Sequence, residues 1–512
     1  MSTPFTKNYH PNAAIFLIIS LELILLLSYN ILEYGSVFLM GDFILKNTFV
    51  FDTDDAEIVR QLSLAERVSE ILKSRYSKKP LAFVHTYGCQ QNVSDSERLK
   101  GLLAVMGYGF TETLEDADLV LYNTCAVREH AEDRVFGNVG VLKACKRKRP
   151  GMLILICGCM AQQPEVVEKI KKSYPYVDIM FGTHVRHKLP EFVYNRLNGS
   201  KRIFENPETN EPFKEGVPLR RDGTFKAWLP IMQGCNNFCS YCIVPYTRGR
   251  ETSREPSAVL EEAKLLVKSG AKEIMLLGQN VNSYGRGNKE KLDFAGLLRA
   301  INDLPGDFRI RFMTSHPKDC SDELLRSMSE CEKVEKHLHL PVQCGSDRIL
   351  KLMNRRYNTE SYLKLIDRAR ELMPDIQFTS DIIVGFPGET YEDFKKTIEL
   401  IKRVEYYSLF TFIFSPRPGT PAAKMEDTAS KEDKSKWFAE MLQVQEEISR
   451  KNNEKLIGKR VRLLIEETDM DRPVGRSSEN LVVTLDKDLA EIGTFVNAEI
   501  TSFDGILHGK II

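Results

Sequence analysis

The sequence predicts an α/β protein of three units: an N-terminal open parallel-sheet α/β domain, a central (β/α) barrel and a C-terminal small antiparallel β-barrel. Apolar strand-like runs alternate with helical stretches up to about residue 450, an order typical of parallel sheets with crossover helices. Short alternating segments punctuated by glycines follow residue 455 and indicate the small β-barrel. With 512 residues, 42% of them hydrophobic, the chain is long enough for several folded domains.

Changes of pattern along the chain set the expected domain boundaries. We expect an N-terminal extension with a leading helix in 1–79, the parallel-sheet domain in 80–200, the barrel in 221–452 and the small β-barrel in 455–512.

The N-terminal extension contains an apolar segment, residues 13–29, that is interrupted by Glu22 and two serines. It is short for a membrane span, and a charge near the middle of a span is costly. We therefore expect residues 1–39 to be either a weak anchor or an upstream extension from a misassigned start codon. We expect no stable membrane partner and a cytoplasmic location.

Charge and cysteine content narrow the class of protein. The formal net charge is zero, so any nucleic-acid binding must come from local basic patches. The 11 cysteines include closely spaced groups that suit metal ligation better than a disulfide framework. These groups indicate a reducing compartment.

The first predicted strand of the barrel, 229–233, is followed by Cys235, Cys239 and Cys242 with C-x3-C-x2-C spacing. Three thiolates can hold three irons of a 4Fe–4S cluster and leave the fourth iron open for another ligand. The alternatives are a structural zinc site without its fourth ligand and buried thiols acting as small hydrophobes. No partner C-x2-C pair follows, which favours the cluster.

Three cysteines of the N-terminal domain each follow a predicted strand. The strands are 81–87, 119–124 and 153–157, and the cysteines after them are Cys89, Cys125 and Cys159. Because intervening helices imply parallel pairing, the cysteines should converge at the carboxyl edge of the sheet. We expect a second cluster there, the alternative being ordinary buried residues, and we assign Cys157 to the core.

Six strand–helix units predict the barrel. They leave open whether it is partial or complete. The strands are 229–233, 273–279, 309–314, 337–342, 377–384 and 407–414, with helices such as 258–269 and 359–373 between them. A long polar helix, 431–453, leads to the last unit, whose strands are 461–466, 481–484, 495–501 and 506–512. From composition alone this small barrel is either a structural appendage or an RNA platform.

Five motifs resemble those of the radical S-adenosylmethionine (SAM) methylthiotransferases. They are TYGCQQN at 86–92, NTCAVRE at 123–129, GCMAQ at 158–162, the segment 235–254 and GQNVNSY at 278–284. The resemblance runs from about residue 80 to the C-terminus and implies a methylthiotransferase domain, a radical SAM barrel and a TRAM domain in that order. One departure is Gln91, where the family usually has Met, which affects local packing but not ligation.

The resemblance implies two 4Fe–4S clusters and SAM as cofactors. Cys235, Cys239 and Cys242 would hold the catalytic cluster that cleaves SAM to a 5′-deoxyadenosyl radical. Cys89, Cys125 and Cys159 would hold an auxiliary cluster that presents sulfur. The residues implied to contact SAM are Gly278, Gln279, Ser380, Asp381, Gly385 and Glu389, although 380–389 also suits a plain strand-to-helix turn.

The resemblance further implies a methylthio transfer to C2 of N6-isopentenyladenosine, 3′ of the anticodon in tRNA. Arg248, Arg250 and Arg254 are the expected contacts to the anticodon stem-loop. An electron donor and a sulfur donor are required, and neither is identified. The alternatives are a sibling enzyme acting on threonylcarbamoyl-adenosine or a ribosomal protein, and a non-catalytic RNA-binding protein with structural metal centres.

Overall fold

The structure is a computed structural model that describes residues 48–512 except 127–128, 208–211, 224, 471 and 487–489. The expectation about residues 1–39 lies outside this part of the chain. Within it, every helix is too short or too polar to cross a membrane.

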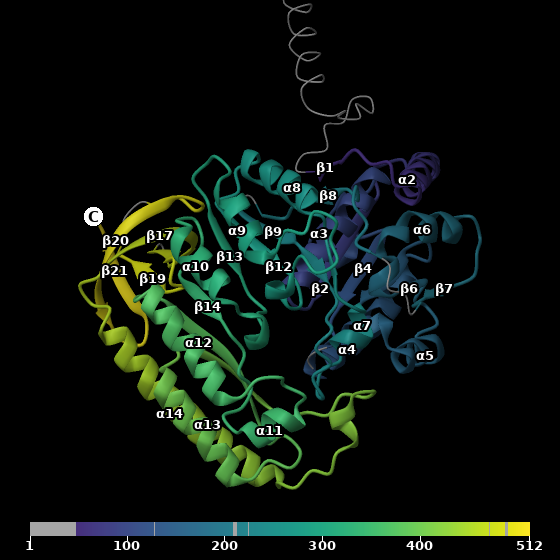
Figure 1. The fold of residues 1–512 in the computed structure, drawn as a ribbon. Helices are drawn as coiled ribbons and strands as arrows, with labels where there is room; N and C mark the ends of the chain where they lie inside the picture. The colour runs from purple at the N-terminus through teal and green to yellow at the C-terminus, as the bar shows by residue number, and fades with distance from the viewer. Residues whose placement is uncertain (1–47, 127–128, 208–211, 224, 471, 487–489) are drawn as a thin grey trace, which may run out of the picture.

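A six-stranded parallel sheet forms the N-terminal part of the fold (Figure 1), with the order β3-β2-β4-β5-β6-β7. The strands are β2 (Leu81–Tyr87), β3 (Gly109–Phe110), β4 (Leu119–Thr124), β5 (Leu153–Gly158), β6 (Ile179–Phe181) and β7 (Ile203–Glu205). The three predicted strands are confirmed as β2, β4 and β5. The other three are only two or three residues long, too short to produce a periodic pattern.

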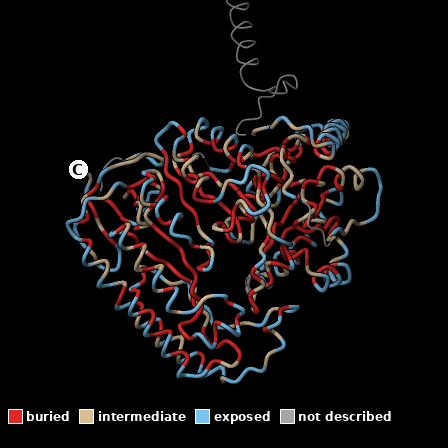
Figure 2. The backbone as a smooth tube through the Cα atoms, in the orientation of Figure 1, coloured by how far each residue is buried: buried red, intermediate tan, exposed pale blue. Residues whose placement is uncertain are grey.

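Helices cover both faces of this sheet. Its helices are α2 (Ala56–Arg75), α3 (Gln90–Val105), α4 (Glu129–Lys148), α5 (Pro164–Ser173) and α6 (Leu189–Leu197). Successive side chains of a strand point to opposite faces, so Leu119 and Leu121 pack with α2, α3 and α6, whereas Val120 and Tyr122 pack with α4 and α5. This double cover explains why all of β4 and β5 is buried (Figure 2).

Six parallel strands form an open barrel in two sheets, β9-β12-β13 and β14-β15-β16, which the bridge between Ile310 and Val334 joins. The strands are β9 (Lys226–Pro230), β12 (Glu273–Leu277), β13 (Arg309–Phe312), β14 (His337–His339), β15 (Gln377–Val384) and β16 (Ser408–Ile413). Among the described strands, β9 and β16 have no outer neighbour, so the barrel is partial.

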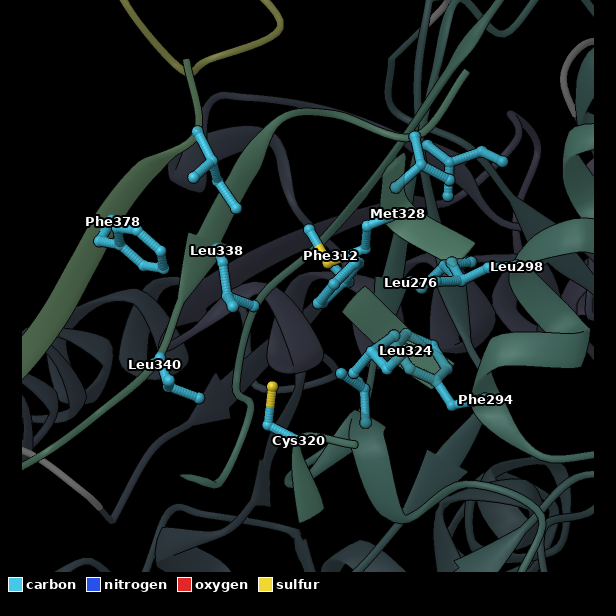
Figure 3. Packing of buried hydrophobic residues seen from close by; sticks show 14 of the residues in the cluster. Leu276, Phe294, Leu298, Phe312, Cys320, Leu324, Met328, Leu338, Leu340 and Phe378 are labelled. Carbon is cyan, nitrogen blue, oxygen red and sulfur yellow. The ribbon is translucent and has the colours of Figure 1, made fainter. Parts of the chain in front are cut away.

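An arc of helices surrounds the open barrel (Figure 1). They are α8 (Pro256–Lys268), α9 (Phe294–Asn302), α10 (Asp322–Glu330), α11 (Asp347–Leu352), α12 (Thr359–Leu372), α13 (Tyr391–Val404) and α14 (Lys431–Glu454). The short helix α7 (Val244–Arg248) lies instead beside the N-terminal part of the fold (Figure 1). Figure 3 shows side chains of the core that the strands and helices share, where Phe312 meets Phe294 edge to face at 5.0 Å between ring centroids. Cys320 belongs to the same core.

Short pairs of strands connect the larger units. The strand β1 (Thr48–Phe49) pairs with β8 (Leu219–Arg220), and β10 (Met232–Gln233) pairs with β11 (Thr252–Ser253). Single 3₁₀ turns lie at 114–116, 160–162, 183–188, 281–283, 317–319 and 421–424.

The C-terminal strands close into a five-stranded barrel of order β17-β18-β19-β21-β20. They are β17 (Arg460–Asp469), β18 (Arg472–Arg476), β19 (Val482–Leu485), β20 (Phe495–Phe503) and β21 (Leu507–Ile511). Two expectations need correction. The strand β18 was not predicted, because a proline and a glycine interrupt its pattern. The barrel is also not wholly antiparallel, because β19 and β21 run parallel.

Buried ion pairs attach the C-terminal barrel to the amino ends of the open-barrel strands. Arg309 donates to Glu273 at 2.7 Å, to the carbonyl of Arg476 at 2.6 Å and to Glu466 at 3.2 Å. The C-terminal barrel therefore lies at the opposite end of these strands from the cysteine loop that follows β10.

Candidate functional site

Cys235, Cys239 and Cys242 lie in the loop between β10 and α7, at the carboxyl end of the first barrel strand. The loop begins at Gly234, whose φ is +74° and whose place a larger residue could not take, because a Cβ would overlap the Arg250 carbonyl. Backbone bonds shape it, with Cys235 N–H donating to Gly249 at 3.1 Å and Cys242 N–H donating to Cys239 at 3.0 Å.

The thiols of this loop are close enough to influence one another. Burial raises the pKa of Cys242 to about 12, with the charges of Cys239 and Cys235 acting in the same direction. Burial likewise raises the pKa of Cys235 to about 11. Thiolates crowded together away from water need cations beside them, and the irons of a cluster supply these.

Among the described residues, no three His, Cys, Asp or Glu side chains are close enough to bind one metal ion. A 4Fe–4S cluster does not require such closeness, because each cysteine binds a different iron. The absence of a single-ion site among the described residues is therefore consistent with a cluster at this loop.

A buried arginine, Arg355, lies beside this loop, and sequence reasoning did not identify it. Its Nη1 is 3.5 Å from the Cys239 sulfur, its Nε donates to the Tyr357 hydroxyl at 2.8 Å and its Nη2 donates to the Pro341 carbonyl at 2.5 Å. It is far from the cysteines in sequence, so no local spacing could have indicated the contact.

Unpaired polar atoms lie just after the carboxyl ends of β12 and β13, at the same end of the barrel strands as the cysteine loop. Within the described part of the chain, Gln279 Oε1, Asn280 Oδ1 and Ser315 Oγ are shielded from solvent without a hydrogen-bond partner. Gly278 lies against Met232, which a Cβ at this position would overlap. An unpaired buried polar atom in a protein marks a place where a water or a polar ligand binds. The SAM amino group can donate to the two amide oxygens, and its carboxylate can accept from the Ser315 hydroxyl.

The segment after β15 contributes in a different way from that expected. Glu389 is buried and accepts from the N–H groups of Gly385 at 2.5 Å and Phe386 at 3.2 Å, so it shapes the turn, and burial raises its pKa to about 7. Gly385 has a φ of +71°. Asp381 is partly exposed and lies 3.5 Å from His339 Nε2.

The expectation that Ser380 contacts SAM is wrong in this structure. Its side chain is fully buried, its hydroxyl donates to the Leu340 carbonyl at 3.1 Å, and it accepts from the Val342 N–H at 2.9 Å. Ser380 therefore holds the chain after β14 in place.

The register of the N-terminal sheet brings the other three cysteines to one edge. Tyr87 of β2 is level with Thr124 of β4, and Thr124 is level with Gly158 of β5. Cys89, Cys125 and Cys159 follow these ends within two residues. Cys157 points into the core beneath the sheet, as expected.

Asn92 ties this edge together, although sequence reasoning did not single it out. It accepts from the Cys89 N–H at 3.4 Å and the Cys89 thiol at 3.3 Å, and it donates to the Thr124 carbonyl at 3.2 Å. Thr124 also accepts from the Cys159 N–H at 2.9 Å. These bonds connect all three strand ends and suit a site held by three thiolates.

The two cysteine groups face each other where α7 meets the N-terminal sheet. Ile243, next to Cys242, packs with Ala126 and Cys159. Arg248, at the end of α7, donates from Nε to the Cys159 sulfur at 3.2 Å. Both groups therefore border one region between the sheet and the open barrel.

Two of the three arginines expected to contact RNA cannot do so in this structure. Arg248 and Arg254 are only 5% and 3% exposed, and both are paired inside the protein. Arg254 donates to Glu215 at 2.7 Å and lies 2.8 Å from Glu262. The error arises because a basic residue in a loop has the same local pattern whether it points outward or crosses to another domain.

Arg250 is exposed, and its contact with RNA stays a prediction. Its guanidinium lies over the Phe238 ring at 4.3 Å from the centroid, and the exposed Tyr246 meets Phe238 edge to face at 6.0 Å. Aromatic rings and arginine planes are the groups on which single-stranded bases stack.

Glu262 of α8 links the N-terminal sheet domain to the open barrel. It accepts from Arg98 of α3 at 2.8 Å and pairs with Arg254. Replacing Glu262 with Gln should lower the free energy of unfolding by about 3–5 kcal/mol, because the buried Arg98 loses its carboxylate partner and Arg254 keeps only Glu215. Urea unfolding followed by circular dichroism measures this. The matched control is Glu261→Gln on the exposed side of the same helix, and equal midpoints for the two variants would refute the expectation.

Comparison with known proteins agrees with this geometry. Residues 229–401 match the radical SAM superfamily, and residues 81–182 match a family described as uncharacterized protein family UPF0004. A solved radical S-adenosylmethionine methyltransferase, TsrM from Kitasatospora setae, shares the fold with a TM-score of 0.50 and 15% identity, covering 68% of this chain and 75% of that chain.

Curated relatives are much more similar. The tRNA-2-methylthio-N(6)-dimethylallyladenosine synthase of Acetivibrio thermocellus is 47% identical, over 91% of this chain and 98% of the relative. The enzyme of the same name from Thermoanaerobacter pseudethanolicus is 48% identical, over 86% of this chain and 94% of the relative. The chain therefore belongs to the family of the tRNA-2-methylthio-N(6)-dimethylallyladenosine synthases within the radical SAM superfamily.

Proposed function

We propose that the chain adds a methylthio group to C2 of N6-isopentenyladenosine 3′ of the anticodon in tRNA, giving 2-methylthio-N6-isopentenyladenosine. The observation that carries the proposal is 47% identity to a named synthase over nearly its whole length. The cofactors are SAM and two 4Fe–4S clusters. A cytoplasmic location follows from the substrate.

The two cysteine groups would hold the two clusters, Cys235, Cys239 and Cys242 the first and Cys89, Cys125 and Cys159 the second. When bound, the first cluster supplies an electron for the cleavage of SAM, and the second supplies the sulfur. The chain itself positions the two groups of thiols. Its loop before α7 carries three of the thiols, and the sheet edge that α7 contacts carries the other three.

Polar groups at the carboxyl ends of the barrel strands would orient SAM. The unpaired oxygens of Gln279, Asn280 and Ser315 suit its charged amino-acid end. Asp381, which is partly exposed at the carboxyl half of β15, suits a hydroxyl of its ribose. Glu389 acts indirectly, by holding the turn at Gly385.

The surface made by Arg250, Phe238 and Tyr246 would contact the anticodon loop, because it lies beside the cysteine loop and offers both charge and stacking. An electron donor and a sulfur donor are still needed for turnover, and both are proposed as separate partners.

Nucleoside mass spectrometry of tRNA tests the substrate. In a bacterial host that lacks its own enzyme of this family, expression of the chain should convert N6-isopentenyladenosine into its 2-methylthio derivative. Methylthiolated threonylcarbamoyl-adenosine should not change. A change in that nucleoside alone would assign the sibling reaction instead.

A second measurement distinguishes the enzyme from the alternative of a non-catalytic RNA-binding protein with structural metal centres. The anaerobically reconstituted protein should release 5′-deoxyadenosine from SAM only when a reductant is present. Binding of tRNA without this product would favour the non-catalytic alternative.

A further inference from the structure

Arg248 belongs to the barrel part of the sequence, but its side chain contacts residues at the edge of the N-terminal sheet. It ends α7, the helix of five residues that begins shortly after Cys242. Its Nε donates to the Cys159 sulfur at 3.2 Å, and its Nη2 donates to Asp95 at 2.9 Å. One short helix thus joins a cysteine of the first group to a cysteine of the second.

Contacts on both sides fix this arginine in its orientation. Asp95 of α3 is itself held by Arg186 at 3.5 Å and by Gln91 at 3.4 Å, and it is almost fully buried. The carbonyl of Thr247 accepts from the Thr183 hydroxyl at 2.5 Å, which ties the end of α7 to the N-terminal part of the chain. The guanidinium therefore cannot turn away from Cys159 without also breaking its buried ion pair with Asp95.

A cation and an N–H donor at a cysteine sulfur act on a cluster in two known ways. Hydrogen bonds to the sulfurs and the local net charge set the reduction potential of the cluster. Partners of the ligands also fix the ligand orientation, and their loss typically costs about 10- to 100-fold in metal affinity or activity.

Two other buried arginines provide comparisons within the same chain. Arg355 is 8% exposed and touches a sulfur of the first group, Cys239, at 3.5 Å. Arg254 is 3% exposed, lies six residues after Arg248, pairs with Glu215 and Glu262 and donates to the Pro230 carbonyl. The three arginines are therefore matched in burial and charge, and Arg254 differs from the other two in having no contact to a cysteine sulfur among its described partners.

We propose that Arg248 is a positioning residue that completes the auxiliary cluster site from the barrel side. It sets the placement of Cys159 and raises the potential of the auxiliary cluster. Through α7, the geometry of that site depends on the loop that carries Cys242. The inference rests on the proposed function only in taking Cys159 as a cluster ligand.

The test isolates the auxiliary cluster in the full-length chain. A parent variant with Cys235, Cys239 and Cys242 all changed to Ala carries only that cluster, so iron content and a potentiometric titration followed by EPR report on it alone. Into this parent we introduce Arg248→Gln, Arg248→Lys and, as the matched control, Arg254→Gln. Circular dichroism of each protein establishes that it is folded.

We expect Arg248→Gln to shift the midpoint potential to a more negative value, or to lower the affinity for the cluster by about 10-fold or more, which is seen as a reduced iron content. Arg248→Lys keeps the charge and should lie between this variant and the parent. Arg254→Gln should leave both quantities unchanged. If Arg248→Gln has the potential and iron content of the parent, or if Arg254→Gln causes the same shift, the inference is refuted.

A reciprocal parent distinguishes this failure from a failure of the proposed function. With Cys89, Cys125 and Cys159 changed to Ala, Arg355→Gln should shift the potential of the remaining cluster and Arg248→Gln should not. If the first parent forms no cluster at all, the proposed function and the inference both fail. If it forms a cluster whose midpoint potential and iron content do not depend on Arg248, only the inference fails.

Discussion

Replacing Cys239 with Ala is expected to lower the formation of 5′-deoxyadenosine from SAM by at least about 1,000-fold. Two remaining thiolates cannot hold the cluster that supplies the electron. Methylthio transfer should stop as well, because it depends on SAM cleavage. Chromatography of the reaction products under anaerobic conditions measures both losses.

The control for this variant is Cys320→Ala. Cys320 is as buried as Cys239, but it packs in the core between the barrel strands and helices (Figure 3). Its truncation removes the same sulfur without touching the loop, and we expect the product yield to stay within a few-fold of the parent. Substantial 5′-deoxyadenosine from the Cys239 variant would contradict the assignment of the first cluster.

Replacing Cys159 with Ala is expected to separate the two half-reactions. The auxiliary site loses a ligand and the partner of Arg248, so methylthio transfer should disappear. Reductant-dependent 5′-deoxyadenosine should persist, because the loop of Cys235, Cys239 and Cys242 is intact. Iron content should fall to about half.

Cys157→Ala is the matched control, since Cys157 lies two residues earlier and points into the core. It should keep its iron and its methylthio transfer, apart from a modest loss of stability from the lost packing. The expectation fails if the two variants behave alike, or if the Cys159 variant still transfers the methylthio group to tRNA.

Much of the fold was predictable because its signals are local. The strand β15 has the predicted bounds, since an apolar run with turn residues on both sides marks a strand directly. The convergence of Cys89, Cys125 and Cys159 was also predictable, because parallel strands joined by right-handed crossovers must end at the same edge.

The errors share a different origin. Ser380 appeared available for SAM and Arg248 and Arg254 for RNA, yet all three are buried in bonds to residues far away in sequence. The parallel pairing of β19 with β21 was missed for the same reason. The sequence of a strand does not show whether its neighbour in the sheet runs parallel or antiparallel.

The sequence by itself determined the two groups of three cysteines, the order of the three folded units and the family to which the chain belongs. Only the tertiary structure decided that Arg248 of the barrel contacts Cys159 of the N-terminal sheet, and that Arg355 contacts Cys239. The physical reason is that periodicity and spacing report on neighbours along the chain. The partner of a buried charge depends instead on which distant surfaces pack together.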